Sequence, residues 1–131
     1  MDGNWQLQTV ETEGIAGTVK VQIFNEADMS CFVGSSWKFN QNNSLGSYSL
    51  DKNAGDCFSI KRDFRWSIFE QADMPSQLQF KRLDAKLKEI DGNDAGYRLR
   101  VIQATKTNML LKMDITFKNR PAALLFNFVR M

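Results

Sequence analysis

The sequence predicts an all-β fold, an up-and-down antiparallel β-barrel of eight to ten strands that forms a single domain over residues 1–131. Three observations predict it. Apolar and polar residues alternate in short segments from Gly3 to Arg130, and such alternation places every second side chain on one face of a strand. Turn-forming residues separate these segments at short intervals, so consecutive strands are expected to be neighbours in space. No linker, repeat or low-complexity stretch divides the chain.

The first half of the chain contains five predicted strands. The first covers Gly3–Val10 and is expected to turn Trp5, Leu7 and Thr9 toward the interior. The other four are expected at Thr18–Phe24, Ser35–Asn40, Leu45–Leu50 and Cys57–Phe69.

The fifth of these segments carries a charge on its apolar side. Phe58, Phe64 and Trp66 share one face of the predicted strand, and Arg62 falls on that same face. A basic residue in phase with an aromatic row is either at a strand end that reaches solvent or a polar group inside a cavity. The pattern leaves both interpretations open.

The second half begins with an ambiguous segment. Leu78 and Phe80 alternate as in a strand, but the apolar residues of 80–90 also recur at helical spacing. We expect a strand over Gln77–Arg82, followed by a second strand or an irregular piece as far as Ile90. The later strands are expected at Tyr97–Ala104, Met109–Lys118 and Ala122–Arg130.

Composition disfavours several classes of function. The chain has 17 basic and 15 acidic residues, a balance too close to neutral to favour binding of nucleic acid. Histidine is absent, which removes the commonest general base and the commonest ligand of catalytic zinc. We therefore expect no enzyme, no metal and no cofactor. No stretch reaches the roughly 18 apolar residues that a membrane-spanning helix needs.

Four loop carboxylates are the clustered acidic candidates for catalysis or for calcium. They are Asp51, Asp56, Asp91 and Asp94. Catalysis would require a cleft in which polar groups with shifted pKa values converge, and the sequence does not predict one. The acidic residues of 91–94 are too few for a calcium-binding loop.

The two cysteines, Cys31 and Cys57, lie 26 positions apart on either side of a predicted hairpin. A disulfide between them would stabilise the fold by about 3–4 kcal/mol, because it restricts the unfolded chain. In a reducing compartment the same residues would be two buried thiols. Their positions alone do not decide between these alternatives.

An eight-stranded barrel is just wide enough to hold one small ligand or to be filled by its own side chains. The predicted inward rows carry large side chains that would line such a cavity. These candidates are Trp37, Phe39, Trp66, Phe80, Met113 and Phe117. They would either contact a small hydrophobic molecule or pack against one another as a solid core. In the second case the protein would be a structural or interaction module.

Four sets of residues occur in a fixed order along nearly the whole chain. Gly3-Asn4-Trp5 begins the first predicted strand, and Phe128-Val129-Arg130 ends the last. Between them lie the block Cys31…Trp37-Lys38-Phe39…Gly46-Ser47-Tyr48…Cys57 and the later strands that contain Phe64–Ile68 and Gly96–Leu99. Together they resemble the lipocalin superfamily, and most closely the small lipocalin-like domains of bacterial cell-envelope lipoproteins.

This resemblance implies roles for particular residues. It implies a disulfide between Cys31 and Cys57, since proteins of that family are exported. It implies that Trp5 closes one end of the barrel with Arg130 lying across it, a contact between a cation and an aromatic ring. It also implies a lipid-like ligand and a place in the periplasm or outer cell envelope of a bacterium, with room for a lipid anchor on a removed N-terminal segment.

The chain differs in one feature from each of two related families. The chain is shorter than a typical secreted lipocalin. Intracellular fatty-acid-binding proteins share the Gly-x-Trp start and this length, but they place two helices after the first strand. The strand predicted at Thr18–Phe24 disfavours that second family.

Overall fold

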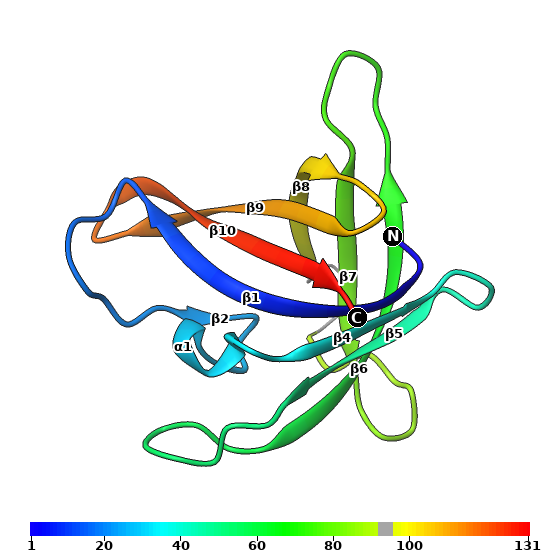
Figure 1. Ribbon diagram of the computed structural model, residues 1–131, viewed down its shortest axis with the longest axis horizontal. Helices are drawn as coiled ribbons and strands as arrows, with labels where there is room; N and C mark the ends of the chain where they lie inside the picture. The colour runs from blue at the N-terminus through cyan, green and yellow to red at the C-terminus, as the bar shows by residue number, and fades with distance from the viewer. Residues whose placement is uncertain (92–95) are drawn as a thin grey trace.

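The computed structural model describes residues 1–91 and 96–131, which contain ten strands and one short helix (Figure 1). Eight strands form a closed antiparallel barrel in the order β1-β10-β9-β8-β7-β6-β5-β4, so neighbours in sequence are neighbours in the sheet and the last strand closes on the first. The barrel strands are β1 (Gly3–Glu13), β4 (Ser36–Asn40), β5 (Leu45–Leu50), β6 (Ile60–Phe69), β7 (Gln77–Leu83), β8 (Tyr97–Ala104), β9 (Asn108–Phe117) and β10 (Arg120–Arg130). The predicted all-β, up-and-down barrel is confirmed.

The barrel closes between its first and last strands, where Trp5 pairs with Arg130. An irregularity in the pairing follows Leu7 and changes which residues face the core. Val10 packs against the core, whereas Thr9, predicted to face inward, is exposed. An extra residue in one strand reverses the faces of the side chains that follow, which is why simple alternation failed here.

Two segments of the barrel differ in detail from the expectation. β6 begins at Ile60, and Phe58 before it is 73% exposed rather than inward. β7 settles the ambiguity after residue 76 in favour of a strand, because Leu78 and Phe80 are both buried on its inner face. Beyond β7 the chain turns, and Glu89 forms a single bridge back to the end of that strand.

The segment between β1 and β4 differs most from the prediction. A strand was expected at Thr18–Phe24, but only β2 (Gln22–Ile23) is extended there. It forms a hairpin with β3 (Ala27–Asp28), and one helical turn, α1 (Met29–Phe32), follows. The hairpin pairs with itself and is not part of the barrel sheet. We call residues 21–32 the plug segment.

The plug segment covers one end of the barrel. It follows the end of β1, so in an antiparallel meander it lies at the end opposite the two chain termini, as Figure 1 shows with α1 and β2 at the left and both termini at the right. Phe24 and Asn25 at its tip have left-handed φ angles of 54° and 49°, which end the strand that the alternation suggested. The whole segment contains one helical turn, not the two helices of the fatty-acid-binding proteins.

The core contains side chains from the plug segment as well as from the strands. Ile23, Phe24 and Phe32 are buried in the same cluster as Trp37 and Leu124. The interior of the barrel is therefore filled partly by a segment that does not belong to its wall.

Candidate functional site

The centre of the barrel is occupied by Phe24. Its ring contacts one aromatic ring from each of five barrel strands. These are Trp37 of β4 at 6.0 Å, Tyr48 of β5 at 6.3 Å, Phe80 of β7 at 5.1 Å, Tyr97 of β8 at 5.2 Å and Phe126 of β10 at 5.9 Å between centroids. A ring that contacts so many strands lies near the barrel axis. Phe24 comes from the plug segment, so this central position is filled from outside the sheet.

Four of the six predicted cavity residues lie together in this core. Trp37, Phe39, Trp66 and Phe80 are all buried. The Trp37 ring lies 6.2 Å from both Phe39 and Phe80, and Phe39 lies 5.2 Å from Trp66. Aromatic pairs at these separations contribute packing energy beyond the burial of their area. The four side chains thus pack against one another and, through Trp37 and Phe80, against Phe24.

The other two candidates lie away from this group. Met113 is half-buried at the margin of the core cluster. Phe117 is also half-buried, at the last position of β9, where Lys118 lies 5.5 Å from its ring. The structure therefore does not bring Phe117 together with the four central aromatic residues.

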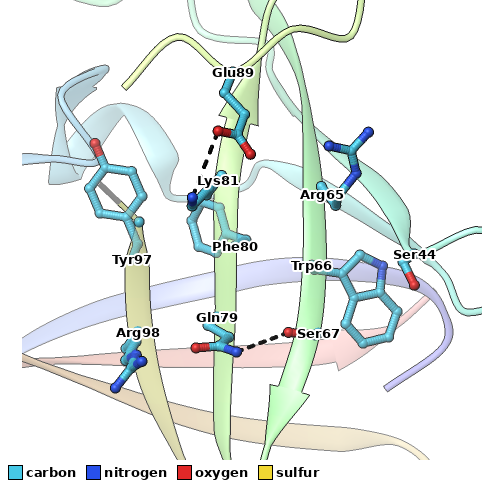
Figure 2. A pocket seen from close by; sticks show the side chains of 11 residues that line it. Ser44, Arg65, Trp66, Ser67, Gln79, Phe80, Lys81, Glu89, Tyr97 and Arg98 are labelled. Carbon is cyan, nitrogen blue, oxygen red and sulfur yellow. Dashed lines mark hydrogen bonds and ion pairs between the residues drawn. The ribbon is translucent and has the colours of Figure 1, made fainter. Parts of the chain in front are cut away.

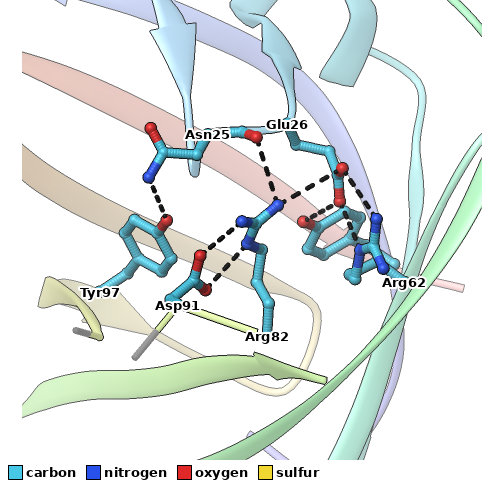
Figure 3. A network of polar contacts seen from close by, with 7 residues as sticks. Asn25, Glu26, Arg62, Arg82, Asp91 and Tyr97 are labelled. Carbon is cyan, nitrogen blue, oxygen red and sulfur yellow. Dashed lines mark hydrogen bonds and ion pairs between the residues drawn. The ribbon is translucent and has the colours of Figure 1, made fainter. Parts of the chain in front are cut away.

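A charged network joins the tip of the plug segment to the barrel wall (Figure 3). The carboxylate of Glu26 accepts hydrogen bonds from Tyr48 Oη at 2.8 Å, Arg62 Nε at 2.7 Å and Arg62 Nη2 at 3.1 Å. Arg82 Nη1 lies 3.4 Å from the same carboxylate. Arg62 thus meets a buried acid on the inner face of the barrel. Of the two interpretations of its inward position, the structure supports a polar group inside the barrel.

Arg82 links the plug segment to the loop that follows β7. Its guanidinium donates two hydrogen bonds to Asp91, with Nε 2.9 Å from Oδ2, and a third to the carbonyl oxygen of Asn25 at 3.3 Å. The Asn25 side chain donates to Tyr97 Oη at 3.0 Å. Asn25 and Glu26, which with Phe24 form the tip of the plug segment, are therefore held by residues of β5 to β8.

The network shifts the pKa values of its members. Burial of Glu26 favours the protonated acid, but the hydrogen bonds from Arg62 and Tyr48 and the charges of Arg62 and Arg82 outweigh it and hold the pKa of Glu26 below its usual value. Hydrogen bonds from Arg82 lower the pKa of Asp91 in the same way. Burial and the nearby Glu26 carboxylate raise the pKa of Tyr48, so its hydroxyl stays a donor. Near neutral pH the network thus contains two carboxylates and two guanidinium groups.

The predicted disulfide between Cys31 and Cys57 is present and anchors the C-terminal end of the plug segment. It joins α1 to the loop between β5 and β6. Lys52 of that loop also donates to the carbonyl oxygen of Ser30 at 2.8 Å. The plug segment is thus fixed covalently near its C-terminal end, whereas its tip is held by non-covalent contacts.

The opposite end of the barrel carries the other predicted pair. The Arg130 guanidinium lies 4.3 Å from the centroid of the Trp5 ring. Arg130 also donates to the carbonyl oxygens of Asp2 and Lys106, and the Trp5 indole donates to the carbonyl oxygen of Met1 at 2.9 Å. The structure therefore brings the pair together among the chain ends and the turn between β8 and β9.

An open hollow of about 780 Å³ lies on the outer face of β6, β7 and β8 (Figure 2). Its wall includes Arg65, Ser67, Gln79 and Arg98, which the strand register places side by side on the outer face. Lys81 also lines it and pairs with Glu89 at 3.7 Å. Trp66, Phe80 and Tyr97 complete the lining, so basic and polar side chains share this surface with aromatic residues.

The loop carboxylates do not converge on a common site where the structure describes them. Asp91 is bound to Arg82, and Asp56 pairs at the surface with Lys20 at 3.3 Å. Asp94 lies outside the described residues. Residues 1–91 and 96–131 contain no group of three or more His, Cys, Asp or Glu that could hold a metal ion. Within the same ranges, no helix has the length and hydropathy needed to cross a membrane.

A model of the lipocalin-like domain family matches residues 1–111, from β1 into β9. The chain belongs to the lipocalin-like domain family. The predicted resemblance is therefore confirmed, and the barrel of this lipocalin-like domain is of a kind that suggests ligand binding. Searches of the curated proteins and of the solved structures each found no match to the chain.

Two central residues of the site, Phe24 and Glu26, were missed by reasoning from the sequence. Phe24 was expected to end a strand, and Glu26 lay in a connection of no assigned role. One signal could have found Glu26. An arginine that faces inward among aromatic residues needs a buried counter-charge, and the acids of the neighbouring connections are the candidates.

Proposed function

We propose that this lipocalin-like domain binds a small hydrophobic, lipid-like molecule inside its barrel. The observation that carries the proposal is the position of Phe24. Its ring fills the barrel centre, yet it belongs to a hairpin whose strands pair with each other and not with the barrel strands. The tip can therefore withdraw without breaking the hydrogen bonds that close the barrel, and the space that it leaves is large enough for an apolar group.

The walls of that space have the chemistry of a ligand site. Trp37, Phe80 and Phe126 would present their rings to the incoming molecule, and Phe39 and Trp66 would lie behind them. Sites for small molecules are mostly apolar with a few polar groups that orient the ligand. The polar groups here are those that bind Glu26.

Titration with the neutral fluorophore N-phenyl-1-naphthylamine tests this proposal. We expect saturable binding to the wild-type protein and at least about tenfold tighter binding to Phe24→Ala, because loss of the ring raises the fraction of protein with an open barrel. Phe58→Ala is the matched control, since that ring is 73% exposed outside the core, and it should bind as the wild type does. Absence of binding to both the wild type and Phe24→Ala would contradict the proposal.

The alternative is a filled barrel that acts as a structural or interaction module. The hollow on the outer face of β6 to β8, which is lined by basic residues such as Arg98 and by aromatic residues such as Trp66, favours this alternative as a contact surface. The same titration separates the two functions, because a permanently filled barrel would exclude the neutral probe from the wild-type protein.

We also infer that the protein is a binding protein and not an enzyme, and that it works in the periplasm or outer envelope of a bacterium. The disulfide between Cys31 and Cys57 supports an oxidising compartment. Alkylation with a maleimide-coupled polymer, applied to cells that have been quenched with acid and denatured, reports the redox state of the two cysteines and so tests the location. We expect no mass shift before reduction and two added polymers after it, whereas two additions without reduction would contradict export.

A further inference from the structure

The inner face of the barrel carries a basic cluster that does not depend on the plug segment. Arg62 of β6 lies directly opposite Tyr48 of β5, and Arg82 of β7 lies opposite Phe64 of β6. Arg62 and Arg82 are therefore diagonal neighbours on one face, with the Tyr48 hydroxyl beside them. Because strand register fixes these positions, the cluster would remain if the tip of the plug segment moved away.

The three side chains converge on a single carboxylate, that of Glu26 (Figure 3). Among the described residues, Arg62 directs its side-chain hydrogen bonds to Glu26, whereas Arg82 also binds Asp91. The Glu26 side chain is only 8% exposed. If Glu26 left, the guanidinium of Arg62 would lose its counter-charge at the margin of an apolar interior. A single negative charge on a ligand would restore the balance.

Phe24 and Glu26 together present the two features of a hydrophobic acid. They are two residues apart on one turn, with the ring at the barrel centre and the carboxylate in the basic cluster. A molecule with an apolar body and one carboxylate could make both sets of contacts when the tip withdraws. Resting on the function proposed above, we propose that Arg62, Arg82 and Tyr48 form the carboxylate site for a hydrophobic acid, and that Phe24 and Glu26 occupy it as an internal competitor.

The construction of the tip suits such an exchange. Its hairpin has two residues in each strand, and Phe24 and Asn25 hold left-handed φ angles that L residues seldom adopt. The contacts of Phe24 and Glu26 offset that backbone cost, so a ligand that takes over those contacts removes the reason for the conformation. The disulfide at Cys31 would keep the displaced segment attached to the barrel.

Isothermal titration of the full chain with decanoate and with 1-decanol, below the micellar concentration and at neutral pH, tests this proposal. The two probes share their alkyl chain and differ in charge. We expect the wild type to bind decanoate on the order of tenfold more tightly than 1-decanol, since hydrogen bonds to a charged group account for a preference of that size. Glu26→Gln should bind decanoate more tightly than the wild type, because the competing carboxylate is gone.

Arg62→Gln examines the origin of the preference. We expect the ratio of the two affinities to fall to about one, because the carboxylate loses its principal donor. Arg62→Lys keeps the positive charge but loses the pair of guanidinium N–H donors, so it should retain part of the preference for decanoate over 1-decanol. This second variant keeps the test valid if Arg62→Gln does not fold. Glu13→Gln is the control for removal of an acid, since Glu13 pairs with Lys112 on the surface, and it should change neither affinity.

Equal affinity of the wild type for both probes would overturn the carboxylate site while the proposed hydrophobic-ligand function stood. An unchanged ratio in Arg62→Gln and Arg62→Lys would also overturn it. Unchanged decanoate affinity in Glu26→Gln would overturn the role of Glu26 as competitor. If neither probe bound to any variant, the proposed function itself would fail and this inference with it.

Discussion

At one end of the barrel Arg130 lies over Trp5, and both residues belong to strands that are already paired in the sheet. At the other end Phe24 and Glu26 enter from the plug segment, which lies outside the sheet. To open the first end, the paired ends of β1 and β10 would have to separate. To open the second, only the side-chain contacts of the tip must be broken, while the disulfide at Cys31 retains the segment.

From this difference we expect the barrel to stay closed at the first end and to open more readily at the second. Backbone hydrogen bonds make the closing strands part of a cooperative unit, whereas a short hairpin attached by side chains can open locally. We therefore expect ligand entry at the end that the plug segment covers, and the predictions below test that contrast.

The largest expected effect comes from Phe24→Ala. Removal of a buried phenylalanine ring leaves a cavity and should lower the free energy of unfolding by about 3–5 kcal/mol, measured by urea denaturation. Phe58→Ala should stay within about 0.5 kcal/mol, because its ring is exposed. A loss below about 1 kcal/mol in Phe24→Ala would mean that the ring does little to hold the plug segment in place.

The next effect is that of the disulfide. Replacement of both Cys31 and Cys57 by Ser should cost about 3–4 kcal/mol, since the bond restricts the unfolded chain. Hydrogen exchange should rise most in residues 21–32 and least at the paired ends of β1 and β10. Reduced wild-type protein should behave as the double variant does. Uniform exchange at both ends would contradict the contrast between the two closures.

The third prediction concerns pH. The pKa of Glu26 is lower in the folded protein than in the unfolded chain, so its stabilising effect is complete above the unfolded value and is lost as pH falls through the folded value. Glu26→Gln should therefore be less stable than the wild type at pH 6, by about 1–3 kcal/mol, and this difference should shrink below about pH 4.5. Urea denaturation of both proteins from pH 3 to 6 measures it. A constant difference would show that Glu26 acts without its charge.

The smallest effect is expected at the opposite end. Arg130→Ala should cost about 1 kcal/mol, because the contact between its guanidinium and Trp5 lies at an exposed position. Arg130→Lys should recover part of that loss. Neither variant should change the affinity for N-phenyl-1-naphthylamine. A tenfold change would indicate that the ligand enters at the Trp5 end and not at the end that the plug segment covers.

Alternation predicted most of the barrel because it is a local property. In β4, residues Trp37 and Phe39 face inward as their spacing requires, and β8 keeps the predicted bounds Tyr97–Ala104. The method failed where the period of two was interrupted. The irregularity after Leu7 turned Thr9 outward, and the left-handed tip at Phe24 ended a strand that looked continuous.

The candidate site was predicted only in part. The sequence placed Trp37, Phe39, Trp66 and Phe80 in the interior, and it put Arg62 on the inward face. It did not place Phe24 among them, because the residues that surround this ring come from five strands and lie up to 102 positions away in the chain. No local pattern reports contacts of that range.

The sequence by itself determined the all-β class, the order of the barrel strands and the face that most of their side chains take, since a period of two is set by the geometry of the strand alone. Only the tertiary structure decided that the connection after β1 enters the barrel and that Glu26 meets Arg62 and Arg82. The physical reason is that a short, weakly paired hairpin takes the conformation that its long-range contacts stabilise, and those contacts exist only after the barrel has closed.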